Sequence, residues 1–186
     1  NSTDRETLKK MERSGCSFIS YGIESMDPSV LVSMKKKAKV ERVDSALKLT
    51  AEEKIGIQGN LIFGDTVETL ETANNSLKWW AKNTDLGVYL SALQVYPGSP
   101  DYIEAVRDGL ITDRDHFVNE LPVSVNISQM NETNRTFLTI LLSTYGLGIL
   151  NVAKDSTHKI SDKQFEGRKT AYDIEFECPS CGDENR

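Results

Sequence analysis

Two cysteines near the end of the chain have the spacing of a metal-ligand pair. Cys178 and Cys181 are separated by two residues and follow a segment that alternates like a β-strand. This spacing is typical of zinc knuckles, in which two such pairs supply four ligands. We therefore expect the first half of a zinc ribbon that residues beyond Arg186 would complete. The alternative is a loose tail with two free thiols, and a redox role is disfavoured because no helix follows to lower a thiol pKa.

Polar side chains also recur at every second position of three apolar segments. Residues that alternate along a strand share one face of its sheet. The polar positions are Ser20, Glu24, Gln58, Asn60, Gln94 and Tyr96. Burying so many polar groups without partners would cost about 1–3 kcal/mol each. We expect a concave sheet face that lines a ligand cavity, the alternative being an open sheet face partly in water.

Each of these segments ends in a polar or glycine-rich turn. The turns cover residues 22–25, 64–69 and 96–100. Ligand sites of α/β proteins gather at the carboxyl ends of parallel strands. The sequence therefore places a binding site where the three turns meet.

The elements that must position these groups alternate between strand and helix. Expected strands cover 18–23, 55–63 and 88–96, and expected helices cover about 4–14, 28–34, 40–53, a segment capped by Asp65 and Glu68, and 100–109. The spacing suits right-handed parallel crossovers, so the fold class is α/β with three consecutive βα units. On the third strand we expect Tyr89, Ser91, Leu93 and Val95 to face the helices.

The pattern changes after about residue 110. Asn131 is placed to cap a helix over about 132–150, residues 151–170 have the composition of a linker, and 172–177 alternates like the first strand of a ribbon. We expect a barrel segment over 1–122, a helical extension and linker over 123–170, and a truncated ribbon element over 171–186.

Composition narrows the function classes. The chain has 186 residues, 38% hydrophobic and 27% charged, with a net charge of −6. A protein that binds nucleic acids or anionic membranes in general would carry an excess of basic residues, so this composition argues against both classes. No stretch approaches the roughly 18 apolar residues that span a bilayer. Three cysteines without a secretory signal fit the cytoplasm. The start at Asn1 and the unfinished cysteine motif fit a piece of a longer polypeptide.

Taken in order, several blocks resemble the second half of the barrel of radical S-adenosylmethionine (radical SAM) enzymes, and most closely the cobalamin-associated branch. The blocks are Leu8-Lys-Lys-Met11 with Gly15-Cys16, Tyr21-Gly-Ile-Glu-Ser25, Met34-Lys-Lys-Lys37, Gly59-Asn-Leu-Ile-Phe-Gly-Asp65 with Glu68-Thr69, and Tyr96-Pro-Gly-Ser-Pro100. They cover about residues 4–111. The resemblance implies three βα units of a partial (β/α)6 barrel of TIM type, followed by a helical extension. It also implies S-adenosylmethionine, a [4Fe-4S] cluster and cleavage to a 5′-deoxyadenosyl radical. Cobalamin is a further cofactor of that branch, and the sequence leaves open whether a cobalamin domain precedes this segment.

The resemblance also assigns roles to residues. Glu24 and Ser25 would bond the ribose hydroxyls or the methionyl amino group, and Lys36 the methionyl carboxylate, although Lys35 and Lys37 compete and a solvated lysine is the alternative. Ile62 and Gly64 would contact adenine, and Val95 and Tyr96 its edge. Asn60 completes the candidate cofactor-binding set, at a place that is often small or glycine. Glu68 and Thr69 would fix a turn, with a helix-capping role for Glu68 slightly favoured.

Two departures qualify this reading. Thr66-Val67 stands where such enzymes usually have Pro-Gly, and no Cys-x3-Cys-x2-Cys motif is present. We expect the C-terminal part of a radical SAM enzyme, inactive alone, that modifies an unknown substrate, methylation being one outcome. The alternative is a non-catalytic half-barrel that binds a ligand or a partner. Unpaired strand edges also predict homodimerisation of this chain.

Overall fold

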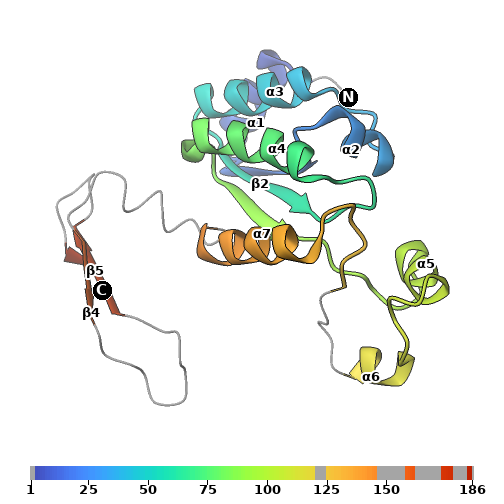
Figure 1. Ribbon diagram of the computed structural model, residues 1–186. Helices are drawn as coiled ribbons and strands as arrows, with labels where there is room; N and C mark the ends of the chain where they lie inside the picture. Colours follow the sequence, from blue (N-terminus) through green and yellow to red (C-terminus); the bar gives the residue numbers. More distant parts are fainter. Residues whose placement is uncertain (1–2, 120–124, 146–157, 162–172, 178–183, 186) are drawn as a thin grey trace. The chain divides into compact units, whose positions relative to one another are not determined.

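The computed structural model describes residues 3–119, 125–145, 158–161, 173–177 and 184–185 (Figure 1). The chain divides into two compact units, Asn1–Gly146 and Leu147–Arg186. Each unit is described by itself. The boundaries expected from the sequence at 122 and 170 stay predictions.

The first unit is built on a parallel three-stranded sheet. Its strands are β1 (Phe18–Glu24), β2 (Gly56–Phe63) and β3 (Val88–Ala92), in the order β1-β2-β3. Both strand pairs are parallel. The predicted α/β class with parallel βα units is therefore confirmed, and the partial (β/α)6 barrel type stays a prediction.

Helices precede, connect and follow the strands. They are α1 (Arg5–Arg13), α2 (Pro28–Ser33), α3 (Val40–Glu52), α4 (Leu70–Lys82), the 3-10 helix η1 (Thr84–Leu86), α5 (Pro100–Arg107), α6 (Arg114–Asn119) and α7 (Glu132–Tyr145). Asp27 caps α2 by accepting from the Ser29 amide at 2.9 Å, with Pro28 in the first turn. Asn131 caps α7 as expected, accepting from the Asn134 amide at 2.9 Å.

The start of α4 differs from the prediction. Asp65 and Glu68 do not cap it; the helix begins at Leu70 and its N-cap is Thr69. The Thr69 hydroxyl accepts from the Thr72 amide at 3.2 Å, and the Thr72 hydroxyl accepts from the Thr69 amide at 2.9 Å. This reciprocal pair is a capping box. The favoured helix-capping role for Glu68 is therefore wrong.

The end of β3 and its facing residues also differ. The strand ends at Ala92 rather than Tyr96, because β2 ends at Phe63 and offers no further partner. Register pairs Leu61 with Leu90 and Asn60 with Tyr89. Paired residues share a face in a parallel sheet, so Leu90 faces the helices and Tyr89 the opposite side. The expected facing of Tyr89 and Ser91 is corrected.

One hydrophobic core holds the sheet to its helices. Its buried members come from the strands, from α3 and α4, and from α7, which lies alongside β3 (Figure 1). They include Ile23, Leu47, Leu61, Trp80, Leu90 and Leu138. The Trp80 indole donates to the Val88 carbonyl at 2.8 Å, which ties α4 to β3. The opposite face carries exposed side chains instead, including Ser20, Gln58 and Asn60.

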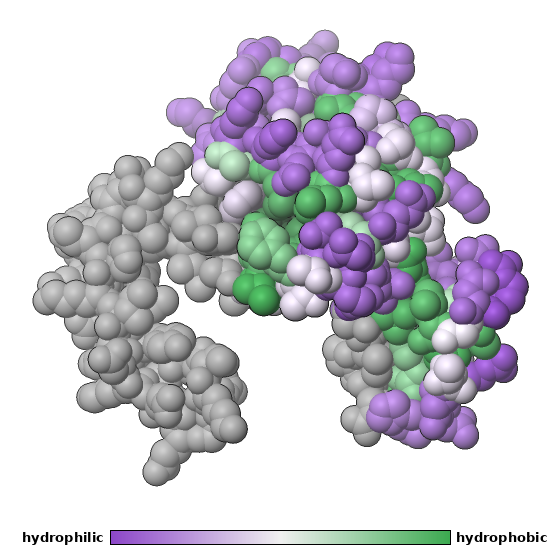
Figure 2. All heavy atoms as spheres, viewed as in Figure 1, coloured by the Kyte–Doolittle hydropathy of each residue, from purple (hydrophilic) through white to green (hydrophobic). Residues whose placement is uncertain are grey.

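A second, smaller core follows β3. Val95, Ala105, Ile111 and Phe117 are buried together there, so α5 and α6 pack on the segment that leaves the sheet. Tyr102 and Phe117 contribute a tilted ring contact with centroids 5.6 Å apart. Hydrophobic residues are also visible on the surface over the α5–α6 region (Figure 2). The exposed hydrophobic residues of this part of the chain include Ile103, Leu110 and Val118.

The second unit contains a small antiparallel sheet. Its strands are β4 (His158–Ser161), β5 (Asp173–Glu177) and β6 (Glu184–Asn185), in the order β4-β5-β6. The strand expected over 172–177 is present as β5, but it is the second strand of its sheet rather than the first, because β4 lies within the segment predicted as linker. Among the residues that the structure describes, no helix has the length and apolarity to cross a membrane.

Candidate functional site

The carboxyl end of β1 carries an irregular backbone. The register with β2 shifts between Gly22 and Glu24, and Glu24 has a φ of 66°. A left-handed conformation is uncommon for a residue with a side chain and recurs at functional sites. The irregularity lets Glu24 turn its carboxylate back along the strand.

Lys36 reaches the same place from the turn that follows α2. The turn contains Lys35 with a φ of 57°, and the Lys36 amide donates to the Leu31 carbonyl at 2.8 Å. Lys36 Nζ then lies 2.7 Å from Glu24 Oε1, an ion pair whose side chains are 39% and 17% exposed. Gly22 leaves the room for it, because a Cβ there would lie 2.9 Å from Glu24 Oε1 and 3.2 Å from Lys36 Nζ.

The ion pair lines a pocket of about 520 Å³. This volume is within the range of small-molecule and cofactor sites. The pocket lies where the chain leaves all three strands, and its lining is Glu24, Ser33, Met34, Lys35, Lys36, Ile62, Asp65, Ala92, Leu93, Gln94, Tyr96, Pro100 and Asp101. Basic groups come from the turn after α2, and carboxylates come from Asp65 in the turn after β2 and from Asp101 in the first turn of α5. Such a lining can hold a ligand that carries both charges beside an apolar body.

Four of the eight cofactor-binding candidates meet in this pocket: Glu24, Lys36, Ile62 and Tyr96. Of the competing lysines, Lys35 also lines the pocket, and Lys36 is the one paired with Glu24. Tyr96 is 63% exposed, so its ring is available at the pocket wall.

The other four candidates lie elsewhere. Ser25 is buried, with its hydroxyl 3.1 Å from that of Ser76, and Val95 belongs to the second core. Asn60 lies on the exposed face of β2, two residues before Ile62. Gly64 lines a neighbouring hollow. Their cofactor-binding roles stay predictions.

Sequence reasoning missed Asp65 and Asp101 as pocket residues. Asp65 is buried and its Oδ1 accepts from the Val67 amide at 3.0 Å. Asp101 lies in the first turn of α5. Their positions were a usable signal, because Asp65 lies within the turn at 64–69, Asp101 directly follows the turn at 96–100, and these turns were already expected to meet at the site.

Glu68 is a fully buried carboxyl in the turn that follows β2. Its Oε2 accepts a hydrogen bond from the Gly64 amide, and its backbone carbonyl accepts from the Gln129 amide at 3.0 Å. Its Oε1 has no hydrogen-bond partner among the described residues. Burial raises the pKa of Glu68 to about 7, and the charges of Asp65 and Asp27 act in the same direction. Glu68 therefore fixes the turn after β2, in agreement with the turn-fixing role.

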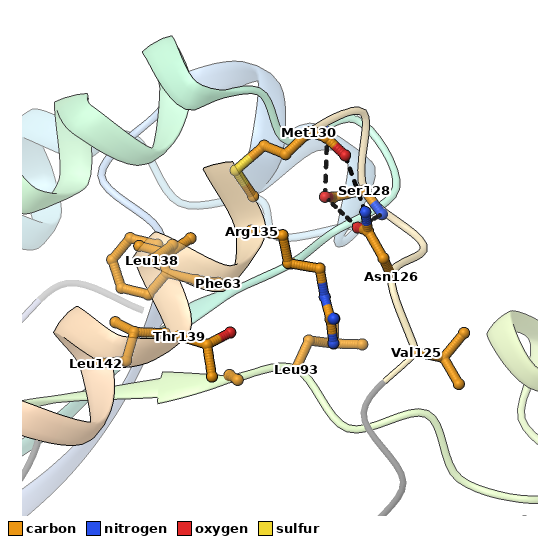
Figure 3. Close-up of a pocket in the computed structure, with 12 residues that line it drawn as sticks. Phe63, Leu93, Val125, Asn126, Ser128, Met130, Arg135, Leu138, Thr139 and Leu142 are labelled. Carbon is orange, nitrogen blue, oxygen red and sulfur yellow. Dashed lines mark hydrogen bonds between the residues drawn. The ribbon is translucent and has the colours of Figure 1, made fainter. Parts of the chain in front are cut away.

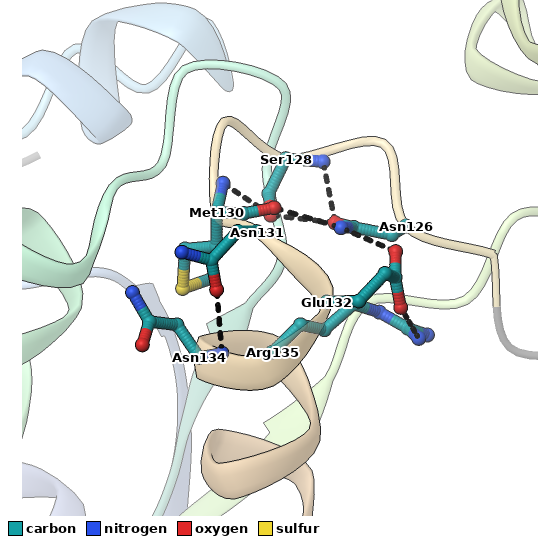
Figure 4. Close-up of polar contacts among 7 residues, drawn as sticks. All are labelled: Asn126, Ser128, Met130, Asn131, Glu132, Asn134 and Arg135. Carbon is teal, nitrogen blue, oxygen red and sulfur yellow. Dashed lines mark hydrogen bonds and ion pairs between the residues drawn. The ribbon is translucent and has the colours of Figure 1, made fainter.

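A second hollow of about 20 Å³ adjoins Gly64, with room for a single water molecule. In Figure 3 the Arg135 side chain extends from α7 toward Leu93. The loop before α7 is held by its own side chains (Figure 4): the Asn126 amide donates to the Met130 carbonyl and to Glu132, both at 2.9 Å. This region organises the start of α7 and is too small for a cofactor.

The described residues contain no group of three or more histidine, cysteine or acidic side chains that could hold a metal ion. Cys178 and Cys181, the proposed metal ligands, lie outside the described residues. Cys16 is a free thiol. The described donor set therefore does not fit a [4Fe-4S] cluster, whereas the pocket fits a zwitterionic, nucleoside-sized ligand by volume and charge.

Comparisons with known proteins bear on this site. No family model matches the chain. It is 29% identical over 114 residues to bacteriochlorophyllide d C-8(2)-methyltransferase of Chlorobaculum tepidum, covering 60% of the chain and 25% of the relative. It is 31% identical over 104 residues to bacteriochlorophyllide d C-12(1)-methyltransferase of the same organism, covering 55% and 23%. The chain thus spans about a quarter of the length of these curated relatives.

Two solved structures also align. Coproporphyrinogen III oxidase (HemN) of Escherichia coli, a radical SAM enzyme, aligns with a TM-score of 0.43 and 16% identity over 59% of the chain and 29% of that structure. Elp3 of Methanocaldococcus infernus aligns with a TM-score of 0.49 and 13% identity over 95% and 50%.

Proposed function

We propose that this chain is the C-terminal part of a radical SAM enzyme and binds S-adenosylmethionine in the pocket at the carboxyl ends of β1, β2 and β3. The observation that carries the proposal is the Glu24–Lys36 ion pair, held by a left-handed Glu24 in the wall of a pocket of about 520 Å³. Both curated relatives are named as methyltransferases, which supports methylation as the reaction.

The chain's own residues position the cofactor. Lys36 provides the cation for the methionyl carboxylate, and Glu24 accepts from the ribose hydroxyls or the amino group. Ile62 and Tyr96 provide apolar surface for adenine. When bound with a cluster, S-adenosylmethionine supplies the radical chemistry, so these residues orient it and exclude water. The cluster ligands are assigned to a part of the enzyme that precedes this chain.

A binding experiment on the chain tests the pocket. S-Adenosylhomocysteine should bind, and Lys36→Ala should weaken binding by about 10- to 100-fold, because a charged hydrogen bond contributes roughly 1.5–3 kcal/mol. Lys37→Ala is the matched control, since it removes the same charge one residue away from the pocket lining. Calorimetry gives both dissociation constants. Equal affinities of the two variants would reject the assignment.

The activity itself is tested on the chain extended upstream. After anaerobic reconstitution with iron and sulfide, the extended protein should release 5′-deoxyadenosine when reduced with S-adenosylmethionine. If the extended protein holds a loaded cluster and still releases no 5′-deoxyadenosine, the enzyme hypothesis is excluded. We also propose cobalamin as an additional cofactor, zinc at Cys178 and Cys181, and a cytoplasmic location, the last from the low cysteine count.

The second candidate is a non-catalytic half-barrel that binds a nucleotide-like ligand or a partner. It is favoured because the described histidine, cysteine and acidic side chains form no group that could hold a cluster. The reading frame upstream of Asn1 separates the two: a Cys-x3-Cys-x2-Cys motif there supports the enzyme, and a start codon near Asn1 supports the module.

A further inference from the structure

Asp65 is a buried carboxylate in the pocket lining that has no ion-pair partner in the described part of the chain. Glu24, in the same lining, is paired with Lys36 at 2.7 Å. Asp65 instead accepts a hydrogen bond from the Val67 amide at 3.0 Å. A buried carboxylate is costly when no cation compensates its charge. The charge of Asp65 is therefore available to a positively charged group that enters the pocket.

Glu68 is a second buried carboxyl in the same turn. Its amide donates to the Asp65 carbonyl at 2.9 Å, and its Oε2 accepts from the Gly64 amide. The residue is fully buried, and its Oε1 has no hydrogen-bond partner among the described residues. It does not belong to the pocket lining. Glu68 thus lies next to the pocket carboxylate of Asp65 without access to a ligand of its own.

The charged groups that act on Glu68 are themselves carboxylates. They are Asp65 in its own turn and Asp27, the N-cap of α2, whereas the loop before α7 meets Glu68 through the uncharged Gln129 amide. Burial and these charges raise the pKa of Glu68 to about 7. A cation placed against Asp65 would offset its charge and favour the ionised form of Glu68. The ionisation of Glu68 is therefore coupled to the occupancy of the pocket.

We infer that Asp65 binds a positively charged group of the ligand, and that Glu68 releases its proton to the solvent when this group arrives. Asp65 contacts the ligand, whereas Glu68 acts through Asp65 and is a positioning residue. The described histidine, cysteine and acidic side chains form no group of three that could hold a metal ion, so an organic cation fits best. The inference rests on the proposed function, because the amino group of S-adenosylmethionine and of S-adenosylhomocysteine is such a cation.

The number of protons released on binding tests this inference. S-Adenosylhomocysteine is titrated into the whole 186-residue chain at pH 6.5 by calorimetry, in phosphate and in bis-Tris, whose heats of ionisation differ. The difference between the two binding heats gives the proton count. If the cation lowers the pKa of Glu68 by about one unit, about half a proton is released at this pH. The affinity should then rise by up to about tenfold between pH 5.5 and pH 8.

A ligand without the cation and three variants provide the controls. 5′-Methylthioadenosine keeps the nucleoside and the thioether but lacks the amino group, so it should release no proton. In Glu68→Gln, whose side-chain carbonyl can still accept from the Gly64 amide, S-adenosylhomocysteine should bind without proton release. Glu71→Gln removes an exposed carboxylate on α4 and should release as many protons as the wild type. Asp65→Asn should weaken S-adenosylhomocysteine binding by about tenfold or more, the loss expected for a charged hydrogen bond.

The outcomes separate this inference from the proposed function. S-Adenosylhomocysteine that binds the wild type without proton release would overturn the inference and leave the proposed function standing. An undiminished release in Glu68→Gln, or an equal release with 5′-methylthioadenosine, would do the same. No binding of S-adenosylhomocysteine at all would overturn both. Thermal unfolding checks the fold of each variant, and if Glu68→Gln does not fold, the wild-type proton count and Asp65→Asn decide.

Discussion

The buried carboxyl of Glu68, in the turn after β2, makes the stability of the folded chain depend on pH. The Gly64 amide favours its ionised form, but burial and the charges of Asp65 and Asp27 outweigh that bond and raise its pKa to about 7. The folded chain therefore holds a proton that the unfolded chain releases near its ordinary value of 4.5. Between these two values the unfolded state binds fewer protons, so the stability falls as the pH rises.

We expect Glu68→Gln to remove this pH dependence. The wild-type free energy of unfolding should lose about 3 kcal/mol from this group between roughly pH 4.5 and 7, from 1.36 kcal/mol per pKa unit. Urea unfolding at several pH values measures this loss. Subtracting the free energy of unfolding of Glu68→Gln from that of the wild type removes the contribution of the other titrating groups. Glu71→Gln, at an exposed position of α4, is the control. If the free energy of unfolding changes with pH in the same way in the wild type and in Glu68→Gln, Glu68 is not the source of the pH dependence.

The residues of the site were only partly predictable. Strand ends and the resemblance located Glu24, Lys36, Ile62 and Tyr96, since their place depends on the order of elements. The direct ion pair was not predictable, because it depends on left-handed backbone at Glu24 and Lys35. Nothing in the residue types required that conformation.

At the scale of elements, overlapping signals explain the errors. Asp65-x-x-Glu68 and Thr69-x-x-Thr72 both have the spacing of a capping box, and Glu68 is engaged with Gly64, which leaves the cap to Thr69. On β3, the apolar Leu93 and Val95 set the expected alternation. They lie after the strand and pack in the second core, so they could not indicate its facing.

We expect Thr69→Ala to destabilise the first unit by about 1 kcal/mol, because it removes the side chain that accepts from the Thr72 amide. Denaturant unfolding gives this difference. Thr72→Ser keeps a hydroxyl for the reciprocal bond and should cost less. A loss in Thr72→Ser as large as that in Thr69→Ala would show that the hydroxyl bonds are not the source.

At the scale of the whole molecule, the sheet has open edges. In the described part of the chain β1 pairs with β2 alone, and Phe18 at its start is 59% exposed. Unpaired edges are templates for strand pairing between chains. We predict that the chain forms a homodimer at high concentration, with a doubled mass in light scattering. A constant monomer mass up to millimolar concentration would contradict this.

Among the residues that the structure describes, the sheet is packed on one side, because its core lies between the strands and α3, α4 and α7. Exposed positions of the opposite face, such as Gln58, Asn60 and Tyr89, thus do not belong to this core. Exchanges there should be nearly neutral for folding. Such a scaffold can acquire new specificities by point changes on its bare side while its architecture is inherited unchanged.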